Sequence, residues 1–300
     1  MKILIATNHL DALGGSETFT HTIVKAAVEY GAQVEIITHK HGMVSRKIQD
    51  DFDVPFRRSN TYDLVLANHN TMVDHCSAQG YGPIIQTCHG IFPKLEQPSV
   101  HAHAYVAISE EVLQHVQNIA LQSIPSMVIR NMIDTDRFDI LNPVSDQCMA
   151  IYSLSQSEEF NAELGRFCHD MGISFNYNNK FMYAIWHTET LINNADMVVS
   201  LGRGAMEAMS CGRQVIVADH RPYQDQISDG VINHFNVDTL ATCNFSGRLT
   251  RQKPGIWELL SDAIEAYDYN ESYLLRDWAV KNLDYRNQFM KYIELWKEIA

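Results

Sequence analysis

The segment SLGRGAMEAMSCG, residues 200–212, places two glycines around an arginine and a glutamate one helical turn further on. Apolar runs flank the segment, which predicts a turn from a buried strand into a short helix. Gly202 and Gly204 leave no side chain between that helix start and a bound anion, and Arg203 adds a permanent positive charge. Glu207 is placed to accept hydrogen bonds from ribose hydroxyls. The pattern predicts a diphosphate site with an adjoining ribose site.

The same segment also has a purely structural interpretation. In that interpretation the glycines only close a tight turn, and Glu207 is a solvated helix residue. A glycine-rich turn taken alone does not decide between the two, because such turns are common. The remaining segments of the chain therefore matter for the choice.

The segment GRGAMEAMSCGRQVIVAD resembles the Glu-Ala-Met-(small)-Cys-Gly-x-x-Val-Ile motif of the family 4 glycosyltransferases. Further resemblances to this family follow in order along the chain: GGSE at 14–17, QTCHG at 86–90, YVAISEEV at 105–112, VIRNMIDTDRF at 128–138 and FMKYIELWKEI at 289–299. The resemblance implies an α/β chain with the GT-B fold, in which two Rossmann-like, doubly wound parallel-sheet domains face each other across a cleft.

The resemblance also implies which residues contact the donor. In the first half of the chain these are Gly14, Gly15 and Ser16 at the phosphates, His89 and Gly90 at the donor sugar, and Arg130 and Asn131 near the linker. In the second half they are Gly202, Arg203, Gly204, Ala205 and Glu207. The paired glycines equally suit a plain turn, and Asn131 equally suits a residue that only stabilises the linker.

The implied reaction moves a sugar from a nucleoside diphosphate sugar, of UDP or GDP type, to a hydroxyl with retention at the anomeric carbon. The implied catalytic residues are His89, Arg203 and Glu207. Backbone amides and Arg203 would stabilise the charge that grows on the departing diphosphate, so neither a metal nor a cofactor is implied. The leaving phosphate would take the acceptor proton, and the acceptor would be a glycan, a lipid-linked sugar or a small molecule.

Two departures from the family pattern are visible. The family has a second glutamate eight positions before the one matched by Glu207, where this chain has the apolar Val199. The family's Arg and Lys after the first strand of the second domain are also absent, because residues 153–159 (SLSQSEE) contain no basic side chain. Losing two cations beside a developing dianion weakens its stabilisation, unless Arg203 replaces one of them.

These departures keep two further functions open. One is a catalytically silent GT-B relative that binds nucleotide, glycan or a protein partner, and the other is a sugar-nucleotide epimerase on the same fold. The Asp-x-Asp at 51–53 formally matches the metal-binding motif of the other large glycosyltransferase fold, GT-A. It lies in an acidic stretch that we expect to be a solvated loop.

The elements that must position these residues follow from hydrophobic patterning. Short apolar runs predict strands buried on both faces at 2–7, 33–38, 63–67, 83–87, 104–108, 149–153, 173–177, 196–201 and 214–219. Helical spacing predicts helices at 16–30, from an N-cap at 109 to about 120, at 160–171, at 182–194, beyond 256, and at 284–299. We expect a first domain at 1–130, a linker at 131–147, a nucleotide-sugar domain at 148–283 and a crossing helix at 284–300.

Composition limits the partners of the chain. A formal net charge of -13 argues against nucleic-acid binding, which needs a surplus of Lys and Arg. No window approaches 18 consecutive apolar residues, so we expect no integral membrane segment and a cytoplasmic protein. The six cysteines lack any Cys-x-x-Cys pair, which favours buried, reduced thiols.

Overall fold

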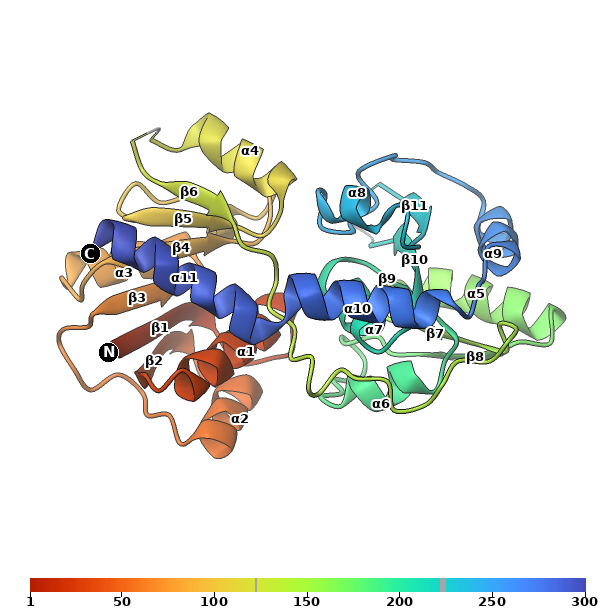
Figure 1. The fold of residues 1–300 in the computed structure, drawn as a ribbon, viewed down its shortest axis with the longest axis horizontal. Helices are drawn as coiled ribbons and strands as arrows, with labels where there is room; N and C mark the ends of the chain where they lie inside the picture. The colour runs from red at the N-terminus through yellow and green to blue at the C-terminus, as the bar shows by residue number, and fades with distance from the viewer. Residues whose placement is uncertain (122, 222–224) are drawn as a thin grey trace. The chain divides into compact units, whose positions relative to one another are not determined.

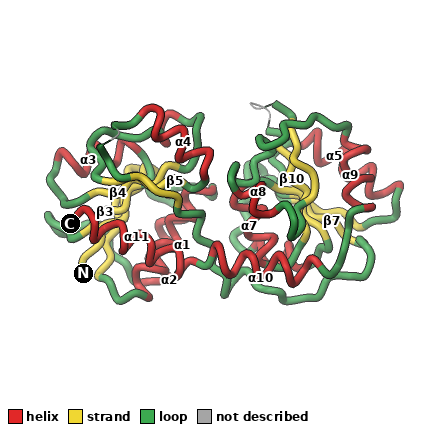
Figure 2. The backbone as a smooth tube through the Cα atoms, turned by 45° about the horizontal axis from the view of Figure 1, so that its top comes forward, coloured by secondary structure: helices red, strands yellow, loops and turns green. Residues whose placement is uncertain are grey.

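The computed structural model describes residues 1–121, 123–221 and 225–300. The chain divides into two compact units, of which the first combines Met1–Met132 with Tyr285–Ala300 and the second is Ile133–Asp284. Figure 1 shows the elements of each unit, and Figure 2 shows that in each unit helices lie on both sides of a central sheet. Residues 133–147, most of the expected linker, belong to the second unit. None of the helices among the described residues is long and apolar enough to cross a membrane.

The first unit is built on a parallel sheet with the strand order β2-β1-β3-β4-β5-β6. The strands are β1 (Lys2–His9), β2 (Gln33–Lys40), β3 (Leu64–Ala67), β4 (Ile84–Cys88), β5 (Ala104–Ala107) and β6 (Ser126–Val128). The helices are α1 (Gly15–Glu29), α2 (Met43–Phe52), α3 (Asn70–Ala78), α4 (Glu110–Ile119) and α11 (Tyr285–Ile299), with a short 3-10 helix η1 (Lys94–Glu96). The strands predicted in this unit are all present.

Packing explains why the apolar runs of this unit are strands. One face of the sheet packs against α3 and α4, where Leu4 and Val65 contact Met72 and Val112 in one buried cluster. The last helix, α11, lies beside α1 in Figure 1, and the hydroxyl of Tyr292 lies 2.9 Å from Thr87 Oγ1 on β4. Both faces are therefore covered, which is the condition under which continuous apolar strands are stable.

Two local expectations have different outcomes. Ser109 caps α4 as predicted, because its hydroxyl accepts a hydrogen bond from the Val112 amide at 3.4 Å. The expected acidic loop at 49–53 is wrong, since α2 extends to Phe52. Asp51 in its last turn pairs with Lys47 and His21, so the helix is held by side-chain contacts that its polar sequence does not reveal.

The second unit is built on a sheet with the order β11-β10-β9-β7-β8. The strands are β7 (Ala150–Ser153), β8 (Ser174–Tyr177), β9 (Met197–Ser200), β10 (Gln214–Asp219) and β11 (Ile227–Val231). The helices are α5 (Glu158–Asp170), α6 (Thr188–Asn193), α7 (Gly202–Ser210), α8 (Val237–Ala241), α9 (Ile256–Glu265) and α10 (Glu271–Leu283). One side packs on α7 and α10, and the other packs on α5 and α9.

The second unit differs from the prediction in two places. The edge strand β11 runs antiparallel to β10, so this sheet is mixed rather than entirely parallel. The helix expected at 182–194 is confined to Thr188–Asn193. Apolar residues at 181–183 contributed to the expected period, but Phe181 and Tyr183 are 70% and 73% exposed and pack on no core. An amphipathic helix is stable when its apolar face packs on a core, and the apolar side chains of Phe181 and Tyr183 are exposed instead.

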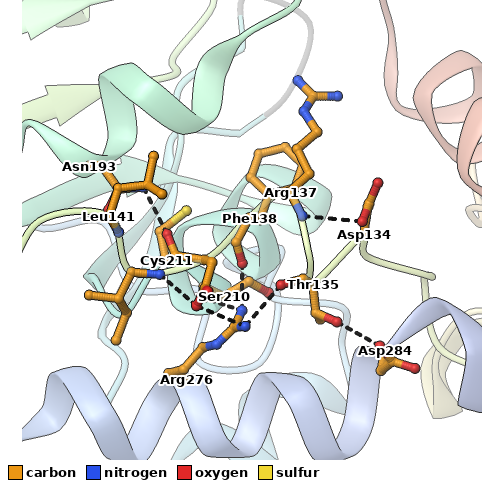
Figure 3. Close-up of polar contacts among 12 residues, drawn as sticks. Asp134, Thr135, Arg137, Phe138, Leu141, Asn193, Ser210, Cys211, Arg276 and Asp284 are labelled. Carbon is orange, nitrogen blue, oxygen red and sulfur yellow. Dashed lines mark hydrogen bonds and ion pairs between the residues drawn. The ribbon is translucent and has the colours of Figure 1, made fainter. Parts of the chain in front are cut away.

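Two arginines connect the beginning of this unit to its later segments. Arg276 of α10 donates to the carbonyls of Thr135 and Phe138 and to that of Ser210 at the end of α7 (Figure 3). Arg213, which precedes β10, is fully buried. It donates to the backbone carbonyls of Asn142, Asn193, Ala195 and Cys211. The segment 134–142 is therefore fixed by guanidinium groups instead of by a strand or helix.

Replacing the buried guanidinium should strongly destabilise the protein. We expect Arg213→Met to lower the free energy of unfolding by about 3–5 kcal/mol, because several carbonyls lose their donor inside the core. Urea unfolding followed by circular dichroism measures the change. Arg166→Met is the control, since the Arg166 side chain is 69% exposed. A change below about 1 kcal/mol for Arg213→Met would contradict this account.

Candidate functional site

In each sheet successive strands are first added on one side of the first strand and then on its other side, so the strand order reverses at that strand. Ligands of open α/β sheets bind outside the carboxyl ends of the strands at such a reversal. In the first unit the reversal lies at β1, whose neighbours are β2 and β3. In the second unit it lies at β7, whose neighbours are β8 and β9. The residues that follow these strands are therefore the first candidates for a site.

In the first unit a histidine and a glutamate meet at the reversal. His9 ends β1, and its Nε2 lies 2.8 Å from Glu17 Oε1 in the first turn of α1. The His9 ring stacks on the ring of His69, which follows β3, with 5.0 Å between centroids. The side chain of Glu17 is 7% exposed and that of His9 is 29% exposed. A carboxylate is thus buried behind an imidazole that solutes can reach.

His69 is the neutral member of this group. Its Nδ1 accepts the hydrogen of the Asn8 amide at 3.1 Å, so the ring hydrogen is on Nε2. Burial, and after it the neighbouring charge of His9, lower the pKa of His69 to about 4. His69 therefore stays uncharged at neutral pH and serves His9 as a stacking surface.

The predicted residue His89 follows β4 and lies near this group. Its Nε2 is 3.3 Å from Asn68 Oδ1, and its ring meets the edge of Phe19. Asn68 in turn donates to Thr20 Oγ1 on α1. A Cβ at Gly90 would lie 2.5 Å from Glu96 Oε2, so the predicted glycine leaves room for a carboxylate of the same unit.

The glycine loop before α1 has an unexpected neighbour. A Cβ at Gly14 would lie 2.2 Å from Glu17 Oε2, so this carboxylate fills the space that the glycine leaves. Ser16 Oγ donates to the same oxygen at 3.2 Å. A Cβ at Gly15 would meet no described atom within 4 Å. The loop was predicted to face phosphates, yet at Gly14 and Ser16 it faces an acid, which disfavours an anion there.

In the second unit the start of α7 is only partly free. Gly202 has a φ of +54°, a conformation that favours glycine, and its amide donates to the Phe245 carbonyl at 2.9 Å. The amide that was predicted to contact a diphosphate is therefore used within the protein in this structure. The structural interpretation of a tight turn holds for this glycine.

The next predicted residues lie closer to the reversal of this sheet. A Cβ at Gly204 would lie 2.4 Å from Ser200 Oγ and 3.1 Å from Leu154 Cδ1, so the glycine lets α7 pack against the loop after β7. Within the described parts of the chain its amide has no hydrogen-bond partner. Ala205 is fully buried in the core below α7. Ala205 thus contributes packing, and Gly204 leaves an amide available.

The two predicted charged residues of α7 pair with each other. Arg203 Nε donates to Glu207 Oε1 at 2.9 Å, and their side chains are 10% and 12% exposed. Burial raises the pKa of the Glu207 carboxyl and lowers the pKa of the Arg203 guanidinium, and the opposite charge of each partner counteracts both shifts. The residues described here provide no partner for the second oxygen of Glu207, so it remains able to accept a hydrogen bond.

Arg137 is a cation of this site that the sequence did not single out. It donates to Glu189 of α6 at 2.7 Å. Its positive charge opposes the rise that burial causes in the pKa of Glu207. Arg276 donates to the carbonyls of its neighbours Thr135 and Phe138, whereas the guanidinium of Arg137 itself points away from Arg276 (Figure 3). Arg137 lies within the motif at 128–138, but no chemical role follows from its position there.

Two other polar groups near this edge have no partner among the described residues. Gln156 Oε1, after β7, and Asn178 Oδ1, after β8, are buried without a hydrogen bond to any described residue. Buried polar atoms usually have a partner, so both are candidates to contact a ligand or water. Arg130 and Asn131 belong instead to the first unit, where Arg130 pairs with Glu110 at 2.9 Å and Asn131 is buried.

No protein-family model matches the chain, and no curated protein matches it. Solved structures do. HepE from Anabaena, solved with UDP, matches with a TM-score of 0.65 and 14% identity over 99% of this chain and 100% of that one. A glycosyltransferase from Rickettsia africae gives 0.67 and 13% over 99% and 98%. A putative UDP-N-acetylglucosamine 2-epimerase from Listeria monocytogenes gives 0.58 and 10% over 97% and 94%.

These likenesses confirm the fold. The chain has the GT-B fold of glycosyltransferases, as the sequence predicted, with two Rossmann-like α/β units. Membership of family 4 in particular stays a prediction.

The buried histidine gives a prediction for stability. Because folding lowers the pKa of His69 from 6.5 to about 4, the folded state resists its protonation, and stability is lost as the pH falls through this window. We expect the burial of this residue to lower the free energy of unfolding by about 2 kcal/mol at about pH 5 relative to about pH 7.5. Urea unfolding at both pH values, compared with His69→Gln, measures the difference.

The matched control for this measurement is His169→Gln, because the His169 side chain is 88% exposed. Its loss should leave the pH dependence of unfolding as it is in the wild type. An unchanged dependence in His69→Gln as well would show that His69 is not the buried neutral group described above.

Proposed function

We propose that this protein is a glycosyltransferase that moves a sugar from a nucleoside diphosphate sugar to a hydroxyl acceptor. The observation that carries the proposal is the start of α7 at the reversal point of the second sheet, with Arg203 and Glu207 on one helix turn. HepE, which has the same fold, was solved with UDP and with UDP-glucose. A UDP or GDP sugar is therefore the proposed donor.

The diphosphate would bind beside the first turn of α7. The free amide of Gly204 and the positive end of the helix favour an anion there. Arg203 and Arg137 would supply the positive charge that residues 153–159 lack. Each now faces an acid, Glu207 and Glu189 respectively, and these acids fix the guanidinium groups before the donor arrives. We propose that these cations stabilise the leaving diphosphate without a metal or another cofactor.

The nucleoside would bind over Glu207 and the neighbouring strand ends. The oxygen of Glu207 that Arg203 does not engage would accept a ribose hydroxyl, which was the predicted role of this residue. Gln156 Oε1 and Asn178 Oδ1 would accept hydrogen bonds from the remaining polar groups of the nucleoside. Binding would satisfy buried acceptors that the described residues leave without a hydrogen bond.

The acceptor would bind in the first unit, where His9, His89 and Asn68 present polar groups at strand ends. A glycan, a lipid-linked sugar or a small molecule is the proposed acceptor class. We propose retention at the anomeric carbon, which the resemblance to family 4 implies. The silent relative and the epimerase remain the alternatives that the assays below distinguish.

Donor binding can be tested on its own by calorimetry with UDP and GDP. We expect Glu207→Gln and Arg203→Met each to raise the Kd of the preferred nucleotide about tenfold or more, through loss of a charged partner. Glu163→Gln and Arg166→Met form the matched control, because they remove a helical ion pair of the same unit in which Arg166 is exposed and Glu163 is half-buried. Equal affinities for all four variants would refute the nucleotide site.

The product of the reaction tests the stereochemistry. We expect proton NMR of the first-formed glycoside to show the anomeric configuration of the donor sugar, because the proposed transfer proceeds on one face. An inverted anomer would contradict retention alone. Nucleotide binding without turnover of any UDP or GDP sugar would favour the silent relative, and isomerisation of the donor without acceptor would favour the epimerase.

A further inference from the structure

Two histidines and an arginine from three separate segments of the first unit lie together beside α3. The ring of His39, near the end of β2, meets the ring of His75, in α3, edge to face with 5.7 Å between centroids. The ring of Tyr81, which follows α3, lies 6.1 Å from the ring of His75 and 5.3 Å from the guanidinium carbon of Arg57. We call these four residues the His39 cluster.

Main-chain contacts hold the cluster in place. The Arg57 amide donates to the Ile36 carbonyl at 2.8 Å, so the segment around Arg57 lies along the outer edge of β2. The Tyr62 amide donates to the Tyr81 carbonyl at 2.8 Å. A Cβ at Gly82 would lie 2.3 Å from the Tyr62 carbonyl oxygen, so this glycine permits the close approach. The positions of Arg57 and Tyr81 therefore do not depend on the polar side chains of the cluster.

The positive charge of the cluster is not neutralised by an acid. Arg57 Nη1 donates to the Ser59 carbonyl at 3.0 Å, and no carboxylate of the described residues forms an ion pair with it. Glu35, on the same face of β2 as His39, pairs instead with Lys2 at 3.4 Å. An unneutralised guanidinium attracts an anion and disfavours a metal cation between the two imidazoles.

The imidazoles can add to this charge. Burial, and after it the charges of His39 and Arg57, lower the pKa of His75 from 6.5. The neighbouring acid of α3, Asp74, accepts a hydrogen bond from Ser99 Oγ. Neither ring nitrogen of His39 or of His75 has a hydrogen-bond partner within the described ranges, and the His39 side chain is exposed. Both rings are therefore able to donate to a ligand, and an anion would relieve the repulsion that opposes protonation of His75.

We propose that Arg57, His75 and His39 form a binding site for a phosphate monoester group, and that His75 takes up a proton when the group binds. The arginine fork and the imidazole N–H groups supply charged donors to the phosphate oxygens. The inference goes beyond the proposed function, because the cluster includes none of the residues assigned to the donor or the acceptor. A free phosphorylated metabolite and a lipid headgroup both present this chemistry.

Anion titrations followed by proton NMR of the histidine rings test the site directly in the wild type. Sulfate is the probe for the pH dependence, because a phosphate monoester itself titrates at about pH 6. We expect the Kd for sulfate, read from the His75 ring resonance, to be about tenfold lower at about pH 5.5 than at about pH 7.5. Methyl phosphate should compete with sulfate and shift the same resonance.

Variants separate the cluster from the rest of the surface. We expect Arg57→Met to raise the Kd for sulfate about tenfold or more at both pH values, through loss of a charged donor. The double variant His39→Gln with His75→Gln should bind sulfate, measured by calorimetry, with nearly the same Kd at both pH values. Arg58→Met and His101→Gln are the matched controls, because both side chains are exposed in the same unit. Urea unfolding verifies that each variant is folded under the titration conditions.

A vesicle experiment distinguishes the two sources of the phosphate group. Stronger binding to phosphatidylcholine vesicles containing phosphatidic acid than to methyl phosphate, at equal phosphate concentration, would support the site and identify a headgroup. Equal or weaker binding to the vesicles, with methyl phosphate bound, would support the site and identify a free phosphate.

Two results would overturn the inference. One is a His75 resonance that neither sulfate nor methyl phosphate shifts at millimolar concentration, and the other is an unchanged Kd in Arg57→Met. Both results would leave the proposed function standing, because these titrations involve no nucleotide and no sugar transfer.

Discussion

The chemistry of this protein is constrained by the burial of its parallel strands. In both sheets the central strands are covered by helices on both faces, so their side chains fill a core and cannot meet a substrate. Polar groups can act only where the strands end. The reversal of strand order then opens one position at that edge in each unit, at β1 and at β7. The candidate sites follow from this constraint.

At those edges the charged groups are held in pairs before any ligand arrives. Arg203 faces Glu207, Arg137 faces Glu189, and His9 faces Glu17. A paired buried charge avoids the cost of desolvating a single ion, so the fold can keep charged side chains at a partly closed site. The pairing also fixes their orientation, which is the requirement for stabilising charge in a reaction. The glycines of the predicted motifs contribute by leaving space for these pairs and for close packing.

Much of the fold was predictable from the sequence, because continuous apolar runs and glycine breaks depend only on local order. The predicted strands of both units are present, and the cap at Ser109 is confirmed. The helix α2 and the antiparallel strand β11 were missed, since contacts from distant residues stabilise them. The helix expected at 182–194 was too long, because a periodic pattern does not say whether a core exists to bury it.

The sequence by itself determined the residue types at the strand ends, and with them the GT-B fold and the segment around Glu207. Only the tertiary structure decided which of these residues meet. It placed Glu17 in the space beside Gly14, used the Gly202 amide internally and brought Arg137 toward Glu207 of α7. The physical reason is that partners in a hydrogen bond or ion pair are set by distance in space, which arises only when separate strands and helices pack together.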